Sequence, residues 1–263
     1  LYVFDSPRMK ALFVDSNDYE FGDNTFVTLR EYQGNTALIR GLVQWQHKFS
    51  DNFLVNAGLS QQYFTLNGSD AVEPRLGVRY SITQKQSLNL GGGLHSQLQP
   101  TYIYFASQDT FGRRVETNRD LDFTRAAHAV LAYDNSFAPL FRAKIELYYQ
   151  YLFSVPVHAF PSFFSVLNLG ADFTSPNVTY LVSNGTGYNY GLELTLEKFY
   201  DRGYYFLFTG SVFESRYRGS DGVLRNTAFN GNYVFNLLGG KELRLGERHT
   251  LILGVHPAHE LCR

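Results

Sequence analysis

The stretch from 189 to 217, NYGLELTLEKFYDRGYYFLFTGSVFESRY, alternates polar and apolar residues, turns at DRG, and then alternates again. Successive side chains of a β-strand point to opposite faces, so this period of two predicts two strands joined by a tight hairpin. Leu192 and Leu194 share one parity, whereas Glu193 and Glu197 share the other. One face of this hairpin therefore needs an apolar environment, and the other needs water or a polar partner.

The same alternation recurs along the chain and predicts about ten antiparallel strands. An amphipathic helix is excluded at 141–151, because Ile145 and Leu147 alternate with Lys144 and Glu146, and a helix would scatter these four side chains around its axis. The predicted strands lie near 37–49, 53–66, 74–82, 87–98, 121–134, 141–153, 187–199, 204–217, 227–239 and 249–256.

Short and long connections alternate between these strands. The short ones are SDN (50–52), TQKQ (83–86), NSFAPL (135–140), DRG (201–203) and KELRLGERH (241–249). The longer ones cover 67–73, 99–120, 154–186 and 218–226. This order predicts an up-and-down antiparallel meander with all short turns at one end, which is typical of transmembrane β-barrels.

The polar parity of the predicted strands carries many charged side chains. Burying them unpaired in a closed core would cost several kcal/mol each, so they must contact water or one another. We expect them to face the lumen of a wide barrel, with lipid against the apolar parity. The lumen-facing set includes Arg75, Arg79, His95, His128, Arg142, Lys144, Glu146, Glu193 and Glu197. The fold class is therefore all-β, an antiparallel up-and-down transmembrane β-barrel segment.

Residues near the strand ends agree with a membrane-spanning sheet. Trp45, Tyr63 and Tyr204 lie where interfacial aromatic girdles are expected, although strand propensity alone also enriches aromatic residues. Lys198 has the apolar parity but lies beside the DRG turn, so we expect its ammonium group to reach out to the membrane interface.

The composition narrows the function classes. The chain has 263 residues, 16% of them aromatic and only 18% charged, and a formal charge of −1, so nothing favours binding to nucleic acid. Cys262 is the single cysteine, which excludes a disulfide framework and a paired-cysteine metal site. Residue 1 is Leu in an aromatic-polar segment, so we expect an internal fragment of a longer protein.

Four blocks of the chain, which together span most of 43–242, are similar to a known family. They read VQWQHKFSDNFLVNAGLSQQYFTLNGSDAVEPRLGVRYSI, LGGGLHSQLQPTYIYF, NRDLDFTRAAHAVLAYD and VSNGTGYNYGLELTLEKFYDRGYYFLFTGSVFESRYRGSDGVLRNTAFNGNYVFNLLGGKE. In order and spacing they resemble the barrel of TonB-dependent outer-membrane receptors, in particular a branch with a regulatory-like β domain ahead of the plug.

The resemblance implies a barrel of about 22 strands, of which this chain supplies fewer than half. Residues 1–263 would be a partial barrel, with strands from about 37 to 256, a loop or strand over 1–36, and a truncated or aberrant tail over 257–263. It further implies the outer membrane of a Gram-negative bacterium and energy-coupled import of a siderophore, cobalamin, glycan or peptide. The implied partners are membrane lipid, a plug domain, the TonB protein acting through a missing N-terminal region, and the nutrient itself. No cofactor and no covalent chemistry are implied.

The resemblance also implies that the long loops contact the ligand. Loop 99–120 combines aromatic rings with arginines, which stack on sugars or hold anionic siderophores. Its candidates are Tyr102, Tyr104, Phe105, Arg113 and Arg114, with loop 154–186 beside them. Ordinary packing within the loop is the competing explanation for these residue types.

His95 and His128 are the one pair with catalytic or metal-binding potential. Both have the lumen parity, and Asp120 and Asp122 lie close in sequence to His128. Imidazole with carboxylate is used by outer-membrane proteases and by weak metal sites, but nothing else in the sequence completes either arrangement. We therefore predict no catalytic and no metal-binding residue. Two alternatives stay open, namely a small outer-membrane barrel enzyme and a carbohydrate-binding β-sandwich.

Overall fold

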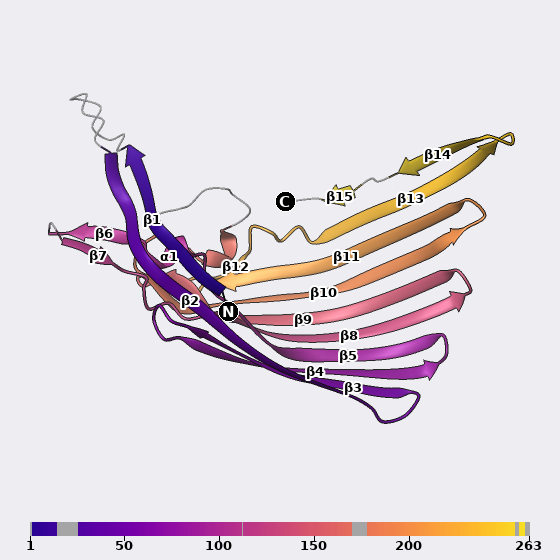
Figure 1. Ribbon diagram of the computed structural model, residues 1–263, viewed down its shortest axis with the longest axis horizontal. Coiled ribbons are helices and arrows are strands. Elements are labelled where there is room, and N and C mark those ends of the chain that lie inside the picture. Colours follow the sequence, from indigo (N-terminus) through magenta and orange to yellow (C-terminus); the bar gives the residue numbers. More distant parts are fainter. Residues whose placement is uncertain (1, 15–25, 112, 170–177, 256–257, 261–263) are drawn as a thin grey trace.

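The chain forms one long, curved antiparallel sheet (Figure 1). The computed structural model describes residues 2–14, 26–111, 113–169, 178–255 and 258–260. The main sheet is 13-stranded, and its strand order is β1-β2-β3-β4-β5-β8-β9-β10-β11-β13-β14, with β12 paired to β11 and β15 paired to β13. Because each strand lies beside its predecessor in the chain apart from the short insertions, the predicted up-and-down meander is confirmed.

The elements of the main sheet agree with most of the predicted strands. Its strands are β1 (Tyr2–Val14), β2 (Phe26–Lys48), β3 (Phe53–Phe64), β4 (Asp70–Thr83), β5 (Gln86–Gln97), β8 (Thr124–Ala138), β9 (Phe141–His158), β10 (Leu181–Asp201), β11 (Tyr204–Arg218), β12 (Leu224–Asn226), β13 (Tyr233–Leu245), β14 (His249–Val255) and β15 (Ala258–Glu260). Outside it are helix α1 (Thr101–Tyr104), the hairpin β6 (Ser107–Thr110) and β7 (Arg113–Glu116), and the 3₁₀ turn η1 (Val166–Asn168).

The short turns gather at one end of the sheet and the longer connections at the other (Figure 1). The DRG turn shows how the sequence closes such a hairpin. Arg202 and Gly203 have φ values of 49° and 79°, and Asp201 pairs with Tyr204 across them. Positive φ at both central residues defines the turn whose twist matches that of antiparallel strands, and glycine adopts it without steric cost.

The two parities form two chemically distinct faces. One row of the register crosses seven strands and is apolar throughout, and we call the side on which it lies the apolar face. It runs through Val55, Val78, Leu90, Leu131, Leu147, Leu192 and Val212. A row of the opposite parity carries Arg79, Asn89, Ala132, Glu146, Glu193 and Ser211, and we call its side the polar face.

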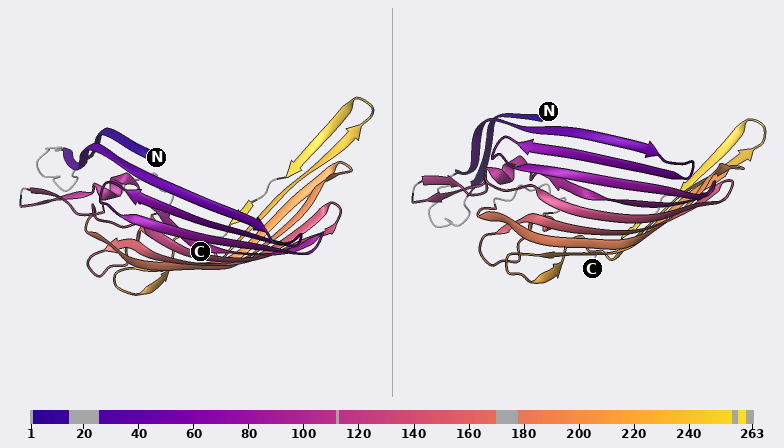
Figure 2. Two further views of the ribbon diagram at one scale, coloured as in Figure 1. Left: turned by 60° about the horizontal axis from the view of Figure 1, so that its bottom comes forward. Right: turned by 90° about the horizontal axis from the view of Figure 1, so that it is seen from below.

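The apolar face has no second layer packed on it among the described residues. Leu76, Leu90 and Leu147 are each 55–56% exposed, which is unusual for leucine in the middle of a long strand. Figure 2 shows the sheet bent into a trough, with no facing sheet of the same chain. The carbohydrate-binding sandwich, which needs these rows sealed in a core, therefore does not describe this fold. No helix in the described part of the chain is both long and apolar enough to span a membrane.

Several boundaries differ from the predicted ones. β13 begins at Tyr233 and continues to Leu245, so KELRL is strand rather than turn, and it pairs with β14. The segment 257–263 was expected to hold no strand, yet Ala258–Glu260 forms β15 against β13. The predicted long loop 99–120 contains α1 and the β6–β7 hairpin. β6 and β7 pair with each other and have four residues each, too few for a clear alternation, whereas β15 depends on its pairing with β13.

Lys198 directs its ammonium group to the DRG turn and buries it there; its place at a membrane interface stays a prediction. Its side chain lies on the apolar face but is only 3% exposed, and Nζ donates to the carbonyl oxygens of Phe199, Asp201 and Tyr204 at 3.2, 3.4 and 3.0 Å. The ammonium group also lies 3.6 Å from the centroid of the Tyr204 ring. Lys198 therefore caps the carbonyls of its own turn instead of extending to the solvent.

The compact core of the molecule lies at the loop end. Phe64, Ile103, Tyr104, Leu121 and Phe123 are at most 3% exposed and belong to one cluster. This cluster joins the ends of β3 and β4 to α1 and to the segment before β8. The longest connection is thereby folded onto the sheet as a packed cap.

Candidate functional site

The candidate site is the polar face, because most of the charged side chains between β4 and β10 project from it. The register places all nine predicted lumen-facing residues on this face, from Arg75 and Arg79 on β4 to Glu193 and Glu197 on β10. A hollow of about 740 Å³ lies on it and is lined by Arg79, Asp134, Arg142 and other polar side chains. Whether this face contacts a plug domain stays a prediction.

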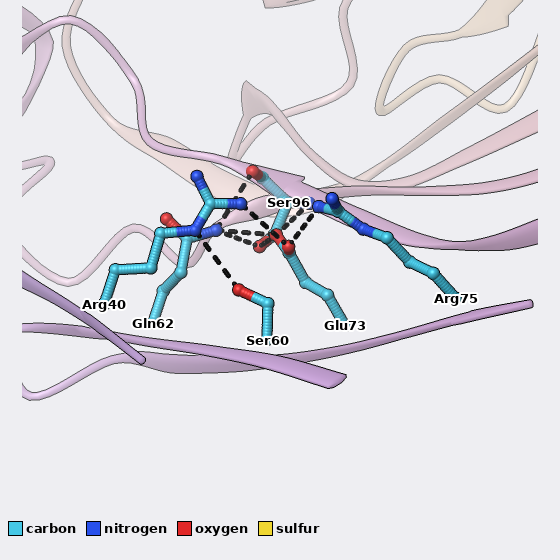
Figure 3. Close-up of polar contacts among 6 residues, drawn as sticks. All are labelled: Arg40, Ser60, Gln62, Glu73, Arg75 and Ser96. Carbon is cyan, nitrogen blue, oxygen red and sulfur yellow. Dashed lines mark hydrogen bonds and ion pairs between the residues drawn. The ribbon is translucent and has the colours of Figure 1, made fainter. Parts of the chain in front are cut away.

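Glu73 is the centre of the most buried polar network (Figure 3). Its side chain is 1% exposed. Oε1 accepts from Gln62 Nε2 at 2.6 Å and from the backbone N and Oγ of Ser96 at 2.8 and 2.5 Å. Oε2 accepts from the guanidinium groups of Arg75 at 2.7 Å and Arg40 at 3.4 Å. Four neighbouring strands, β2 to β5, therefore supply donors to one carboxylate.

This network leaves the carboxylate fully hydrogen-bonded and surrounded by positive charge. Arg40 also donates from Nε to Ser60 Oγ at 3.2 Å, which fixes the guanidinium plane above β3. A buried charge is tolerated only when it is paired and hydrogen-bonded, and Glu73 meets both conditions. Two arginines against one glutamate leave this part of the wall with a formal excess of one positive charge.

The sequence prediction omitted Glu73. Its parity is that of Arg75, so alternation alone could have placed it on the polar face. Its burial could not be read from the sequence, because Arg40 and Ser96 lie 33 and 23 residues away and only the strand register brings them together.

A second charged group lies nearer the short turns. Arg142 forms a bidentate ion pair with Asp134 on the adjacent strand β8, and its NH1 lies 3.7 Å from Oε2 of Glu197 on β10. Lys144 pairs with Glu146 at 2.7 Å along β9. These side chains are 20–37% exposed, so water shares their charge and each pair stabilises the sheet only modestly.

His95 and His128 do come together, as their shared parity suggested. Their rings meet edge to face with centroids 4.4 Å apart, and His128 Nδ1 lies 3.5 Å from Gln150 Nε2. Asp120 and Asp122 are exposed in the segment before β8, and within the described chain neither bonds to an imidazole. The described residues contain no group of three or more His, Cys, Asp or Glu side chains able to hold a metal ion.

The predicted ligand-contact loop divides into two parts. Tyr104 and Phe105 are 0% and 3% exposed, and burial raises the pKa of Tyr104 to about 12. Tyr102 packs against the same cluster, so these rings serve the cap rather than an open surface. Arg113 and Arg114 are exposed on β7, and Arg114 Nε donates to Ser107 Oγ at 2.7 Å. Ligand binding by this loop stays a prediction.

Asn118, which the sequence reading did not single out, fixes this cap to the sheet. It is 1% exposed and donates from Nδ2 to the carbonyl oxygens of Ile103 and Val178, at 3.0 and 2.6 Å. Its Oδ1 accepts from the backbone N of Leu181 at 3.0 Å, at the start of β10. One buried amide thus holds α1 against the connection that follows β9.

Comparison with known proteins shows the fold of the chain. No protein-family model and no curated protein sequence matches the chain. The solved structure of the FrpB iron transporter from Neisseria meningitidis matches 84% of this chain and 32% of that chain, with 14% identity and a TM-score of 0.57. The siderophore receptor PirA from Pseudomonas aeruginosa matches 88% of this chain and 42% of that chain, with 11% identity and a TM-score of 0.60.

The outer membrane transporter YddB from Escherichia coli matches 89% of this chain and 40% of that chain, with 10% identity and a TM-score of 0.57. The chain thus spans 32–42% of the length of these structures. At such identities the likeness shows the fold. The chain therefore has the fold of the barrel wall of TonB-dependent outer-membrane receptors, as its sequence resemblance predicted.

Proposed function

We propose that this chain is part of the barrel wall of a TonB-dependent importer in the outer membrane of a Gram-negative bacterium. The observation that carries the proposal is the separation of the two faces. An apolar row crosses seven strands, and its four leucines and Val212 are 43–56% exposed. The next row carries arginine, asparagine and glutamate. A single-layered sheet of this kind satisfies both faces when lipid covers one and water or a polar domain covers the other.

The polar face would then contact the plug domain and the water around it. Arg75, Arg79 and Lys144 offer donors, and Glu146 and Glu193 offer acceptors along the same wall. Arg75 already donates to Glu73, whereas Arg79, Lys144, Glu146 and Glu193 lie outside that network and are available to a second domain. In this mechanism the wall binds and guides and does no covalent chemistry.

Closure of the barrel requires further strands beyond the described sheet. Within the described residues the strand path ends at β1 and β14, and each outermost strand has one unpaired edge. In hydrocarbon, every unpaired N–H and C=O group costs several kcal/mol. We therefore propose that additional strands of the native gene product pair with these edges.

The enzyme alternative has weaker support. The solved structures with this fold are named as transporters and receptors. His158 Nδ1 lies 3.0 Å from Ser162 Oγ at the loop end, which is the nearest approach to a nucleophile pair on the described surface. The carboxylate of Asp221, in the adjacent loop, accepts hydrogen bonds from Arg225. Within the described residues no acid therefore orients His158.

Localisation and energy coupling of the native gene product test this proposal. We expect the protein in the outer-membrane fraction on a density gradient, with an apparent mass on gels that shifts on boiling, as folded barrels show. Accumulation of its nutrient should stop when the TonB gene is deleted. A protein found in the soluble fraction, or uptake that continues without TonB, would contradict the proposal.

A further inference from the structure

We propose that a pocket on the polar face of β9, β10 and β11 binds a neutral, hydroxyl-rich ligand, a sugar unit of an oligosaccharide. This inference rests on the proposed import function and names the class of nutrient. The pocket has no charged side chain in its own lining, although Tyr148 and Gln150 also border a neighbouring hollow with His128, Glu146 and Glu193. It holds about 350 Å³, within the usual range for ligand sites. Its lining is Tyr148, Gln150, Leu152, Leu167, Asn189, Phe213, Ser215, Thr227 and Phe229.

Two neighbouring register rows form the floor of the pocket. Tyr148, Gly191 and Phe213 lie opposite one another across the three strands. The next row of this face is Gln150, Asn189 and Ser215. Two aromatic side chains therefore flank a glycine, and a row of two amides and one hydroxyl lies beside them.

Gly191 lets its cross-strand neighbours pack closely on the central strand at the floor of the pocket. A Cβ atom at this position would lie 2.7 Å from Tyr148 Oη and 2.8 Å from both Phe213 Cβ and the Val212 carbonyl oxygen. No real Cβ makes contacts this short, so any other residue would push the two rings apart or fill the space between them. The lack of a side chain on the central strand is thus a structural requirement of this pocket.

The loop end supplies the remaining wall. Leu167 of η1 contacts the floor beside Gly187, where a Cβ would lie 2.7 Å from Leu167 Cδ1. Thr227 donates from Oγ1 to Ser215 Oγ at 2.7 Å and brings the following segment, with Phe229, over β11. Phe229 is 53% exposed, so its ring is available to a ligand that enters from the loop end.

The chemistry of the lining selects an uncharged ligand. No Asp, Glu, Lys, Arg or His lines the pocket, so neither an anionic siderophore nor a cation would find a charge to compensate it. The polar groups are two amides and three hydroxyls, which both donate and accept. Sugar hydroxyls do the same, and the apolar faces of sugar rings pack against rings such as those of Phe213 and Phe229.

One acceptor of the pocket is unused within the described chain. Asn189 donates from Nδ2 to Gln150 Oε1 at 2.6 Å, but its buried Oδ1 has no hydrogen-bond partner there. A buried acceptor without a donor costs about 1–3 kcal/mol. The oxygen is closed to solvent in this structure, so a ligand hydroxyl recovers that free energy once a neighbouring side chain moves aside and lets it donate to Oδ1. Sites built in this way discriminate strongly in favour of ligands that carry the hydroxyl.

Calorimetric titration of the folded native gene product in detergent tests the inference. The neutral probes are maltohexaose, cellohexaose and mannohexaose, and the charged comparators are hexagalacturonate and ferric enterobactin. We expect at least one neutral probe to bind, and Phe213→Ala and Asn189→Asp each to weaken that binding by about tenfold or more. Asn236→Asp is the matched control, because it makes the same amide-to-carboxylate change on β13, outside the pocket lining, and should leave binding unchanged.

Each outcome is decisive once the heat-dependent gel shift shows that a variant is folded. The inference is overturned if no neutral hexasaccharide binds, if only the charged comparators bind, or if the pocket variants bind as well as the control. Phe213→Leu replaces Phe213→Ala if the latter does not fold. The import proposal is tested separately, by the membrane fraction and by the dependence of uptake on TonB. If the protein imports a charged nutrient in a TonB-dependent way, only the proposal of sugar binding in the pocket is contradicted.

Discussion

The polar face of this sheet has two regions with opposite chemistry. On β2 to β5, a buried carboxylate gathers two guanidinium groups and three further donors. On β9 to β11, at the pocket, the same face offers amides, hydroxyls, aromatic rings and leucine side chains, and no charged group. Both regions follow one alternation rule, so parity decides which face a residue occupies but not what that face does. The cross-strand neighbours decide that.

The difference has a simple physical origin. Around Glu73, donors from adjacent strands converge on one small acceptor, and burial makes every one of these hydrogen bonds necessary. Around Gly191, the missing side chain lets Tyr148 Oη and Phe213 Cβ lie close to the strand backbone, at the floor of a pocket without charged side chains. One region of the sheet therefore makes all its hydrogen bonds internally, while the next region has a pocket that a ligand could enter.

The largest effect on stability is expected when the charge of Glu73 is removed. We expect Glu73→Gln to lower the free energy of unfolding by about 3 kcal/mol, because the new amide points donors at Arg40 and Arg75 and the arginines lose their counter-charge. Asp134→Asn is the matched control, since the same chemical change at a carboxylate that is 20% exposed should cost about 1 kcal/mol.

Urea unfolding of the native gene product in detergent micelles measures both values. Equal losses of unfolding free energy in the two variants would mean that burial does not distinguish these carboxylates. The buried network around Glu73 would then not stabilise the sheet as described.

The neutral region is tested by filling its floor. Gly191→Ala should lower the free energy of unfolding by about 2 kcal/mol through overpacking against Tyr148 and Phe213, and it should reduce the pocket. Gly91→Ala is the control on the same face, because a Cβ there meets nothing within 4 Å. The same urea titration separates the two. If both alanines are neutral, Gly191 does not hold the rings together as described.

The smallest effect on stability is expected from the ion pair between Asp221, in the loop after β11, and Arg225. The hydrogen bond from Arg225 and that from the backbone N of Val223 hold the pKa of Asp221 below its usual range. A depressed pKa means that this ion pair stabilises the loop above the pKa of the unfolded chain, about 3.9, and that the stabilisation is lost as the pH falls through the folded value.

An NMR titration of the labelled aspartate carboxyls checks this. The Asp221 midpoint should lie below 3.9 and should rise in Arg225→Gln, while the pocket remains unaffected at neutral pH. A midpoint that does not respond to Arg225→Gln would show that the pair is not formed in solution.

Sequence reasoning recovered the main strands, the turn end and the faces of the sheet, because these depend on local period and on turn residues such as Arg202 and Gly203. It left 1–36 open as a loop or strand, and β1 and the start of β2 lie there. It did not predict the β6–β7 hairpin, which is a local pairing inside the segment read as a loop, or β15, which pairs with β13. It proposed Tyr104 and Phe105 as ligand contacts, yet both rings are buried in the cap. Aromatic residues in a long loop look alike in sequence whether they pack inward or face a ligand.

The amino-acid sequence by itself determined that this chain is a two-faced antiparallel sheet, because a strand sorts alternate residues onto opposite faces whatever its neighbours are. Only the tertiary structure decided that Glu73 meets Arg40 and that Gly191 separates Tyr148 from Phe213. The physical reason is the register. Hydrogen bonds between strands bring residues distant in the chain to within contact distance, and a shift by one residue would exchange every one of these partners.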